Sequence, residues 1–196
     1  MSYQVKIDAH GEDKNTPGSV GAWVLIWVEL TEFALFFLVF LVARAHNPDL
    51  FHEGPTRLNT IAGALNTLIL ITSSYCVARA VSAIKQGNRQ ACLRWLYGTL
   101  GMGVAYSLVK FWEYYWNDLA GLSLRTDIYY SLYYYLTFNH FLHVIMGMMV
   151  IGWVCVNTHL GHYSKEDHGG LESGASYWHM IDLVWIIIFP LLYVFR

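Results

Sequence analysis

Five long apolar stretches occupy most of this 196-residue chain and leave little room for any other kind of structure. A helix needs about 20 apolar residues to cross the hydrocarbon core of a membrane. The segments at about 18–44, 59–84, 91–116, 130–157 and 173–195 meet that length. The chain is 13% charged, roughly half the charged fraction of a typical soluble domain. We therefore predict an all-α polytopic membrane protein, with five transmembrane helices forming a single membrane domain over residues 18–196.

Short polar connections separate these segments. Asn47-Pro48 is predicted to stop the first helix, because proline cannot continue the hydrogen-bond ladder. The turn Lys85-Gln86-Gly87-Asn88 is too short for anything except an antiparallel hairpin between segments 59–84 and 91–116. Segment 91–116 is expected to end in a tryptophan belt at Trp116, followed by a polar loop. A tyrosine cluster at the start of the fourth segment predicts a girdle at headgroup level. Its members are Tyr129, Tyr130, Tyr133, Tyr134 and Tyr135.

The distribution of basic residues predicts the orientation. Residues 1–17 are polar and lack the basic-then-apolar order of a signal peptide, so we expect a short, uncleaved tail. One side of the predicted bundle collects seven basic residues, and the other collects four. The first set is Lys6, Lys14, Arg79, Lys85, Arg89, Arg94 and Lys165; the second is Arg44, Arg57, Arg125 and Arg196. The positive-inside rule then places the N-terminus in the cytoplasm and the C-terminus outside.

Several classes of function find no support. The net charge of −2 and the absence of a basic patch argue against nucleic acid as a partner. Cys76, Cys92 and Cys155 form no C-x-x-C pair, and we expect them to be buried small hydrophobes rather than metal ligands. Phosphate-binding glycine loops and nucleophile elbows are absent from the sequence. No segment outside the membrane is long enough to house a soluble active site.

Small and weakly polar residues form a seam along segment 59–84. Residues of this kind allow membrane helices to approach closely and to hydrogen-bond across the contact. The seam is therefore predicted to be a helix-packing face rather than a binding site. Its members are Asn59, Gly63, Asn66, Thr67, Ser73 and Ser74.

Ionisable residues inside the apolar segments are the most unusual feature of the chain. A charged side chain at the centre of a membrane helix costs about 2.5–3.5 kcal/mol on translocon scales, so its presence demands an explanation. They occur as four pairs spaced three residues apart, which places each pair on one face of its helix. The pairs are Glu29 with Glu32, Lys110 with Glu113, His140 with His143, and His179 with Asp182. We expect all of them to point into the bundle as a polar network.

The chemistry of this network has more than one interpretation. Lys110 and Glu113 can neutralise each other, and a structural ion pair is favoured over a catalytic role. His179 and Asp182 can hydrogen-bond to each other, or each can reach a different helix. The carboxyl groups outnumber the single lysine. The network could therefore relay protons, or it could simply hold the helices in register.

A metal or haem site is the principal alternative. His140, His143 and His179 could bind a haem or, together with Glu29, Glu32 and Asp182, a di-iron centre. A di-iron centre in a helical bundle normally uses a Glu-x-x-His motif on two helices, and no membrane segment carries one. A membrane metalloenzyme or haem enzyme therefore stays the alternative. A proton-coupled transporter is a third, although the chain lacks the internal repeats and broken helices of that class.

Five motifs, in order along the chain, carry a family resemblance. They are LTEF at 30–33, NTLIL at 66–70, EY at 113–114, FNHFLHVIMG at 138–147 and YWHMIDLVW at 177–185. Together they resemble the conserved bundle of cytochrome c oxidase subunit III over about residues 18–195.

The resemblance implies a non-catalytic accessory subunit of a haem-copper oxidoreductase in the cell inner membrane, with its C-terminus in the periplasm. Subunits III bind no haem or copper, so the resemblance implies no catalytic, cofactor or metal residue in this chain. It implies a haem-copper catalytic subunit and phospholipids as partners, and a supporting role in stability and proton uptake. Glu32 aligns with the family's buried glutamate, which is known for its reactivity toward carbodiimides.

The sequence also departs from the usual family pattern. The seven-helix form has two further N-terminal helices, and a lipid-holding cleft of that form would lack one wall here. Lys110 stands where many oxidase subunits carry glutamine, and Asn139 departs from the motif just before His140. Short loops and the Lys-x-x-Glu-Tyr sequence favour the five-helix subgroup associated with nitric oxide reductase. Cytochrome c oxidase and nitric oxide reductase both remain open as the partner.

Overall fold

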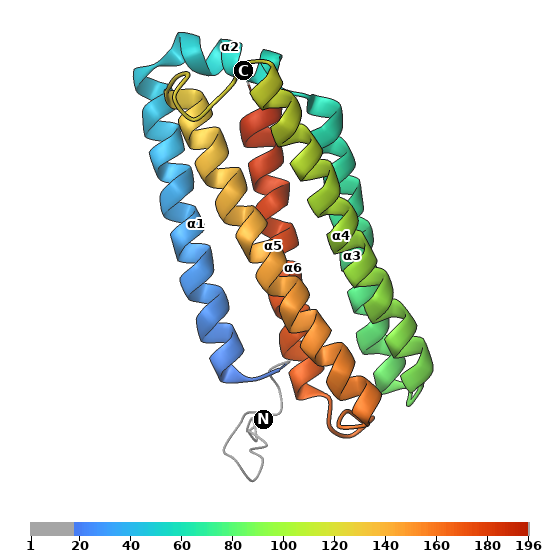
Figure 1. The fold of residues 1–196 in the computed structure, drawn as a ribbon. Coiled ribbons are helices and arrows are strands. Elements are labelled where there is room, and N and C mark those ends of the chain that lie inside the picture. Colours follow the sequence, from blue (N-terminus) through green and yellow to red (C-terminus); the bar gives the residue numbers. More distant parts are fainter. Residues whose placement is uncertain (1–17, 196) are drawn as a thin grey trace.

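The computed structural model describes residues 18–195 and contains six helices, five of them long (Figure 1). The long helices lie side by side, and the short helix α2 crosses one end of the bundle. The predicted all-α class is therefore confirmed. The helices are α1 (Val20–His46), α2 (Pro48–Arg57), α3 (Thr60–Lys85), α4 (Arg89–Leu119), α5 (Ile128–Leu160) and α6 (Gly169–Tyr193).

Four helices, α1, α3, α5 and α6, are long and apolar enough to cross a membrane. Helix α4 is 31 residues long, but it contains Arg89, Arg94, Lys110 and Glu113 and does not reach the same apolar character. The predicted count of five spans is therefore not confirmed. Helix α4 nevertheless runs along α3 over its length (Figure 1), so five spans stay a prediction.

Helices α3 and α4 form the predicted antiparallel hairpin. Their turn contains Gly87 at a φ of +76°, a left-handed conformation that glycine adopts without strain. The Asn88 side chain then accepts a hydrogen bond of 3.0 Å from the backbone N–H of Ala91 and caps the start of α4. Further along, Gly98 on α4 faces Cys76 on α3, where an added Cβ would lie 3.6 Å from the sulfur, an ordinary van der Waals contact. The three cysteines are all buried and free, as predicted.

Helix α1 contacts the bundle through one narrow stripe. Its buried residues are Ile26, Phe33 and Phe40, spaced seven residues apart. Seven residues are close to two helical turns, so these side chains line one face. Most other apolar residues of α1 are exposed on the protein surface, Trp27 by 67%. At its start, the backbone N–H of Ser19 donates to Ser173 Oγ at 2.9 Å and ties α1 to α6.

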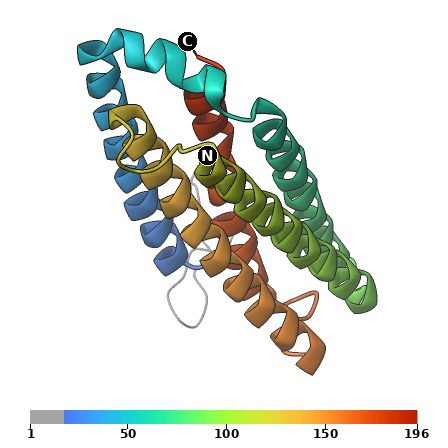
Figure 2. The same cartoon turned by 45° about the horizontal axis from the view of Figure 1, so that its top comes forward.

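Helix α2 was not predicted. We expected Asn47-Pro48 to end the first helix and a loop to follow, but Pro48 occupies the first turn of a new helix, where its missing N–H costs nothing. Figure 2 shows α2 lying across the end of the bundle between α1 and α3. Phe51 is buried against Phe40 and Tyr129, with ring centroids 5.0 and 5.4 Å apart. Gly54 lies against the ring of Tyr129 with no space for a Cβ atom.

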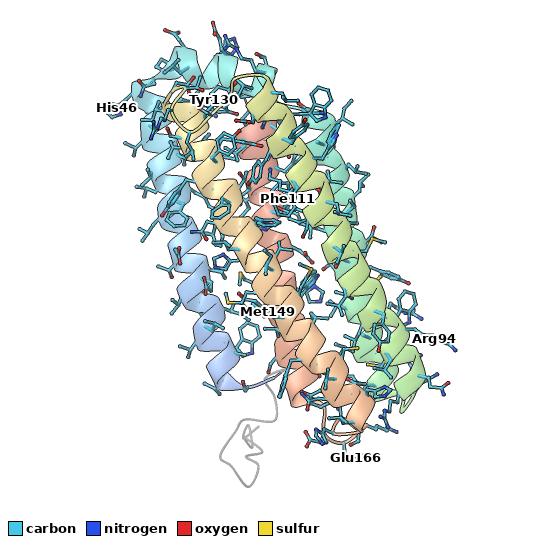
Figure 3. The ribbon with its side chains drawn as sticks, in the orientation of Figure 1. His46, Arg94, Phe111, Tyr130, Met149 and Glu166 are labelled. Carbon is cyan, nitrogen blue, oxygen red and sulfur yellow. The ribbon has the colours of Figure 1, made fainter. Side chains whose placement is uncertain are left out.

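Only part of the predicted tyrosine girdle faces outward: Tyr135 is 54% exposed, whereas three of its neighbours are buried. Tyr129, Tyr130 and Tyr133 are each 1% exposed or less and point into the bundle. Tyr129 donates a 2.5 Å hydrogen bond to the carbonyl oxygen of Leu192 on α6. In Figure 3, Tyr130 lies beneath α2, where its hydroxyl donates to the Gly54 carbonyl at 3.4 Å. Helical phase, rather than membrane depth, decides where these rings point.

The opposite end of the bundle collects the start of α1, the α3–α4 turn and the α5–α6 loop (Figure 1). Figure 3 places Arg94 and Glu166 there. Glu172, in the first turn of α6, ties these elements together. Its carboxylate accepts a hydrogen bond of 3.3 Å from the Gly18 backbone N–H, just before α1, and forms an ion pair of 2.7 Å with Lys85, at the end of α3. This grouping agrees with the sides assigned from the sequence. The tail at 1–17 lies outside the described residues, and the orientation stays a prediction.

Candidate functional site: an intramembrane polar network

Lys110 and Glu113 on α4 form the predicted ion pair, with Lys110 Nζ 3.0 Å from Glu113 Oε2. Both side chains are fully buried. The other two donor positions of the lysine reach the hydroxyl oxygens of Tyr193 at 2.9 Å and Tyr133 at 3.4 Å. Those two hydroxyls donate in turn to Glu113 Oε1, at 2.5 and 2.7 Å. Every donor and acceptor of the pair is satisfied, which is the condition for tolerating buried charge.

Aromatic rings enclose the ammonium group of Lys110. Four rings have their centroids between 5.0 and 5.6 Å from Nζ, within the range of cation–π attraction. They come from three helices and belong to Tyr114, Tyr133, Trp185 and Tyr193. The lysine therefore joins α4, α5 and α6 at one point.

His140 on α5 forms a second junction. Its Nε2 lies 3.1 Å from the carbonyl oxygen of Ile181, which can only accept, so Nε2 carries the proton. Nδ1 then accepts a 3.0 Å hydrogen bond from the hydroxyl of Tyr106 on α4. The His140 ring also packs against the Trp185 ring at 5.1 Å. Both ring nitrogens are occupied by helix-to-helix links.

The predicted packing seam of α3 pairs with α6. Trp178 Nε1 donates to Ser73 Oγ at 2.9 Å, and Trp185 Nε1 donates to Thr67 Oγ1 at 3.0 Å. Both tryptophans are fully buried. Gly63 lies against the Phe189 ring, where an added Cβ would come within 2.9 Å. The seam is a packing face, as predicted.

His179 contacts α3 rather than Asp182: its Nδ1 lies 2.6 Å from Ser74 Oγ. The Asp182 carboxyl is buried, and neither of its oxygens has a hydrogen-bond partner among the described residues. Both polar atoms of the fully buried Asn66 side chain also lack a hydrogen-bond partner among the described residues. Buried polar atoms of this kind are usually satisfied by internal water.

Glu29 and Glu32 on α1 meet His143 on α5. His143 Nε2 is 2.6 Å from Glu29 Oε2, and the Asn139 amide donates to Glu32 Oε1 at 3.3 Å. The side chains of His143 and Glu29 are 11% and 12% exposed. His143 Nδ1 lies 2.8 Å from the Asn139 main-chain carbonyl, which fixes the ring orientation.

The predicted residues therefore form several junctions, not one site. Within residues 18–195, one group of three side chains could ligate a metal ion: Glu29, Glu32 and His143. Each offers one possible ligand atom, and these three atoms lie within 4.8 Å of one another. His140 and His179 do not join this group, so the three histidines are not gathered into one metal cluster. The sequence reasoning also missed residues that complete the network: Tyr106, Asn139, Tyr193 and the polar tips of Trp178 and Trp185. Their helical spacing from the charged residues was the available signal.

These observations define a class: a polytopic helical membrane protein whose ionisable residues lie at helix–helix junctions. A sequence model described as cytochrome c oxidase subunit III matches residues 19–196. The chain belongs to that family, as the motifs predicted.

Relatives in the family align over most of their own length. Cytochrome c oxidase subunit 3 of Synechocystis sp. is 31% identical over 189 residues, covering 95% of this chain and 80% of the relative. Cytochrome c oxidase subunit 3 of Thermostichus vulcanus is 31% identical over 176 residues, covering 89% and 86%. The probable cytochrome c oxidase subunit 3 of Nocardia farcinica is 31% identical over 184 residues, covering 93% and 91%.

Proposed function

We propose that this chain is an accessory subunit of a haem-copper oxidase, which supports the catalytic subunits and carries no redox centre of its own. The family match over residues 19–196 is the observation that carries the proposal. The engagement of Lys110, Glu113 and His140 in links between helices supports a structural role for them. A protein of this kind requires a membrane partner, and the exposed apolar surface of α1 supplies area for a subunit or for lipid.

We further propose that the chain helps to sustain proton uptake by its partner, with Glu32 as the residue involved. Glu32 is partly buried and accepts a hydrogen bond from a neutral amide rather than from a cation. Phospholipid is expected against the apolar faces of α1.

Purification of the tagged chain from its native membrane in a mild detergent tests the accessory role. The expected result is co-purification of a haem-copper catalytic subunit, identified by mass spectrometry, with the haem absorbance lost when that subunit is removed. A stoichiometric haem signal that stays with the isolated chain would contradict the proposal. The reaction of the complex with oxygen or with nitric oxide then distinguishes an oxidase partner from a nitric oxide reductase partner.

A further inference from the structure

The contact of Glu29, Glu32 and His143 brings two carboxylates and an imidazole to one point between α1 and α5. Glu29 and Glu32 lie in the first half of α1, a helix apolar enough to span the membrane. One possible ligand atom from each of Glu29, Glu32 and His143 lies within 4.8 Å of the other two. Among the described residues, Arg57, Lys85 and Lys110 form ion pairs with other carboxylates, and the ion-pair partner of Glu29 is His143. A carboxylate without a cation inside a membrane helix would be costly.

The orientation of His143 sharpens this problem. Its Nδ1 faces a main-chain carbonyl oxygen at 2.8 Å, and a carbonyl can only accept, so Nδ1 carries a proton. In the neutral ring, Nε2 then presents a lone pair to Glu29 Oε2 at 2.6 Å. A lone pair and a carboxylate oxygen repel at this distance. At 2.6 Å only a proton fits between the two atoms, so a metal ion can take that position only when they move apart.

The surroundings of His143 match those of a metal-ligating histidine. Such histidines donate their second ring N–H to a carbonyl or carboxylate, which fixes the tautomer and raises the basicity of the ligating nitrogen. The Asn139 side-chain amide, one turn away, holds Glu32 at 3.3 Å in the same way. Residue 139 therefore orients two of the three ligands, one with its backbone and one with its side chain.

Tyr177 on α6 supplies an independent observation. Its side chain is 96% buried, since its exposed fraction is 4%, and its hydroxyl has no hydrogen-bond partner among the described residues. That hydroxyl is close enough to Glu29 to interact with it electrostatically. A buried phenol needs a partner, and a metal-bound water or a metal-bound carboxylate would provide one.

We propose that Glu29, Glu32 and His143 bind one divalent transition-metal ion of the Zn²⁺ class. One imidazole nitrogen and two carboxylate oxygens form a ligand set that suits such ions and leaves a fourth position for water. The ion and the two carboxylates sum to zero charge, which removes the electrostatic cost of the acidic pair. Binding requires Nε2 and Oε2 to separate to about 3.4 Å, given ligand bonds of roughly 2.1 Å in a tetrahedral arrangement.

Co²⁺ provides a direct probe because its visible absorption reports its coordination. The full-length chain in detergent is stripped with a chelator and titrated with Co²⁺, followed by displacement with Zn²⁺. We expect one saturable equivalent with absorption bands that Zn²⁺ abolishes. Glu29→Gln and His143→Gln should each weaken binding about tenfold or more, because each removes a ligand while keeping the side-chain volume close. His179→Asn removes an intramembrane imidazole outside the cluster and should leave the titration unchanged.

Glu32→Gln provides a second arm in case a variant at 29 or 143 does not fold, with folding checked by helical content and gel filtration. Weakened Co²⁺ binding in the folded Glu32→Gln protein supports the site. The absence of a saturable equivalent in the wild-type chain would overturn the proposal, as would binding that persists unchanged in the folded variants. The second case assigns the positive charge between His143 and Glu29 to a proton. A bound ion would hold Glu32 as a ligand, so a positive titration would replace the proposed proton-handling role of Glu32 with metal binding. Neither result bears on the accessory role, because that role is read from co-purification.

Discussion

The Lys110 ammonium group lies 3.0 Å from the Glu113 carboxylate inside a shell of aromatic rings, and neither side chain is exposed. The pair is only three residues apart on one helix, but its hydrogen bonds extend to Tyr133 on α5 and Tyr193 on α6. A local pair on one helix thus becomes the point at which three helices are joined.

Replacement of Lys110 by methionine should lower the free energy of unfolding by about 3–5 kcal/mol, because it leaves the Glu113 charge buried without a cation. Denaturant titration in detergent, followed by the loss of helical signal, measures the change. The double variant Lys110→Met with Glu113→Leu should recover much of the loss, since no unpaired charge remains. Lys165→Met, at an exposed loop position, is the matched control and should change little. Equal losses in the single and double variants would contradict this account.

Two glycines of α5 should respond oppositely to alanine. An added Cβ at Gly147 would come within 2.6 Å of Ile181 Cδ1 and 2.9 Å of the Trp178 ring, whereas Gly152 has nothing within 4 Å. Gly147→Ala should therefore destabilise by about 1–3 kcal/mol, the usual cost of overpacking. Gly152→Ala should be neutral, or stabilising by up to about 1 kcal/mol through helix propensity. Thermal unfolding of the two variants in the same detergent compares them, and a stable Gly147→Ala protein would argue against the close α5–α6 contact.

The hydrogen bond between Trp178 Nε1 and Ser73 Oγ should be measurable as a coupling energy. Trp178→Phe and Ser73→Ala each remove one partner, and the double variant completes a double-mutant cycle. We expect a coupling of roughly 0.5–1.5 kcal/mol, as for hydrogen bonds between membrane helices. A cycle with zero coupling would show that the seam is held by packing alone.

Glu32→Gln should leave assembly of the oxidase complex intact, because glutamine keeps the oxygen that accepts from Asn139. It removes the ionisable group, so the complex should lose activity sooner during sustained turnover. Activity followed over many catalytic cycles, together with subunit stoichiometry by mass spectrometry, measures both effects. Glu166→Gln, an exposed loop substitution, serves as the control. Loss of the complex in Glu32→Gln would assign this residue a purely structural role.

The sequence by itself determined the all-α membrane class, the α3–α4 hairpin, the packing seam of α3 and the family. These properties depend on local quantities: the length of an apolar stretch, a turn too short for other connections, and residue spacing along one helix. The family motifs are likewise read directly from the order of residues. The Lys110–Glu113 pair was predictable for the same reason, since both partners lie on one face of one helix.

Only the tertiary structure decided which helices meet and in what rotation. Helix α2 is held in place because two of its own residues, Phe51 and Gly54, pack against Tyr129 on α5. No local sequence pattern predicts that contact. The rotation of α5 turns Tyr133 inward to Glu113, although the sequence pattern assigned this tyrosine to a girdle at headgroup level. The same rotation separates His140 from His143, which then face α4 and α1 respectively. Spacing along one helix specifies a face, but the neighbour that this face meets depends on packing between residues far apart in the chain.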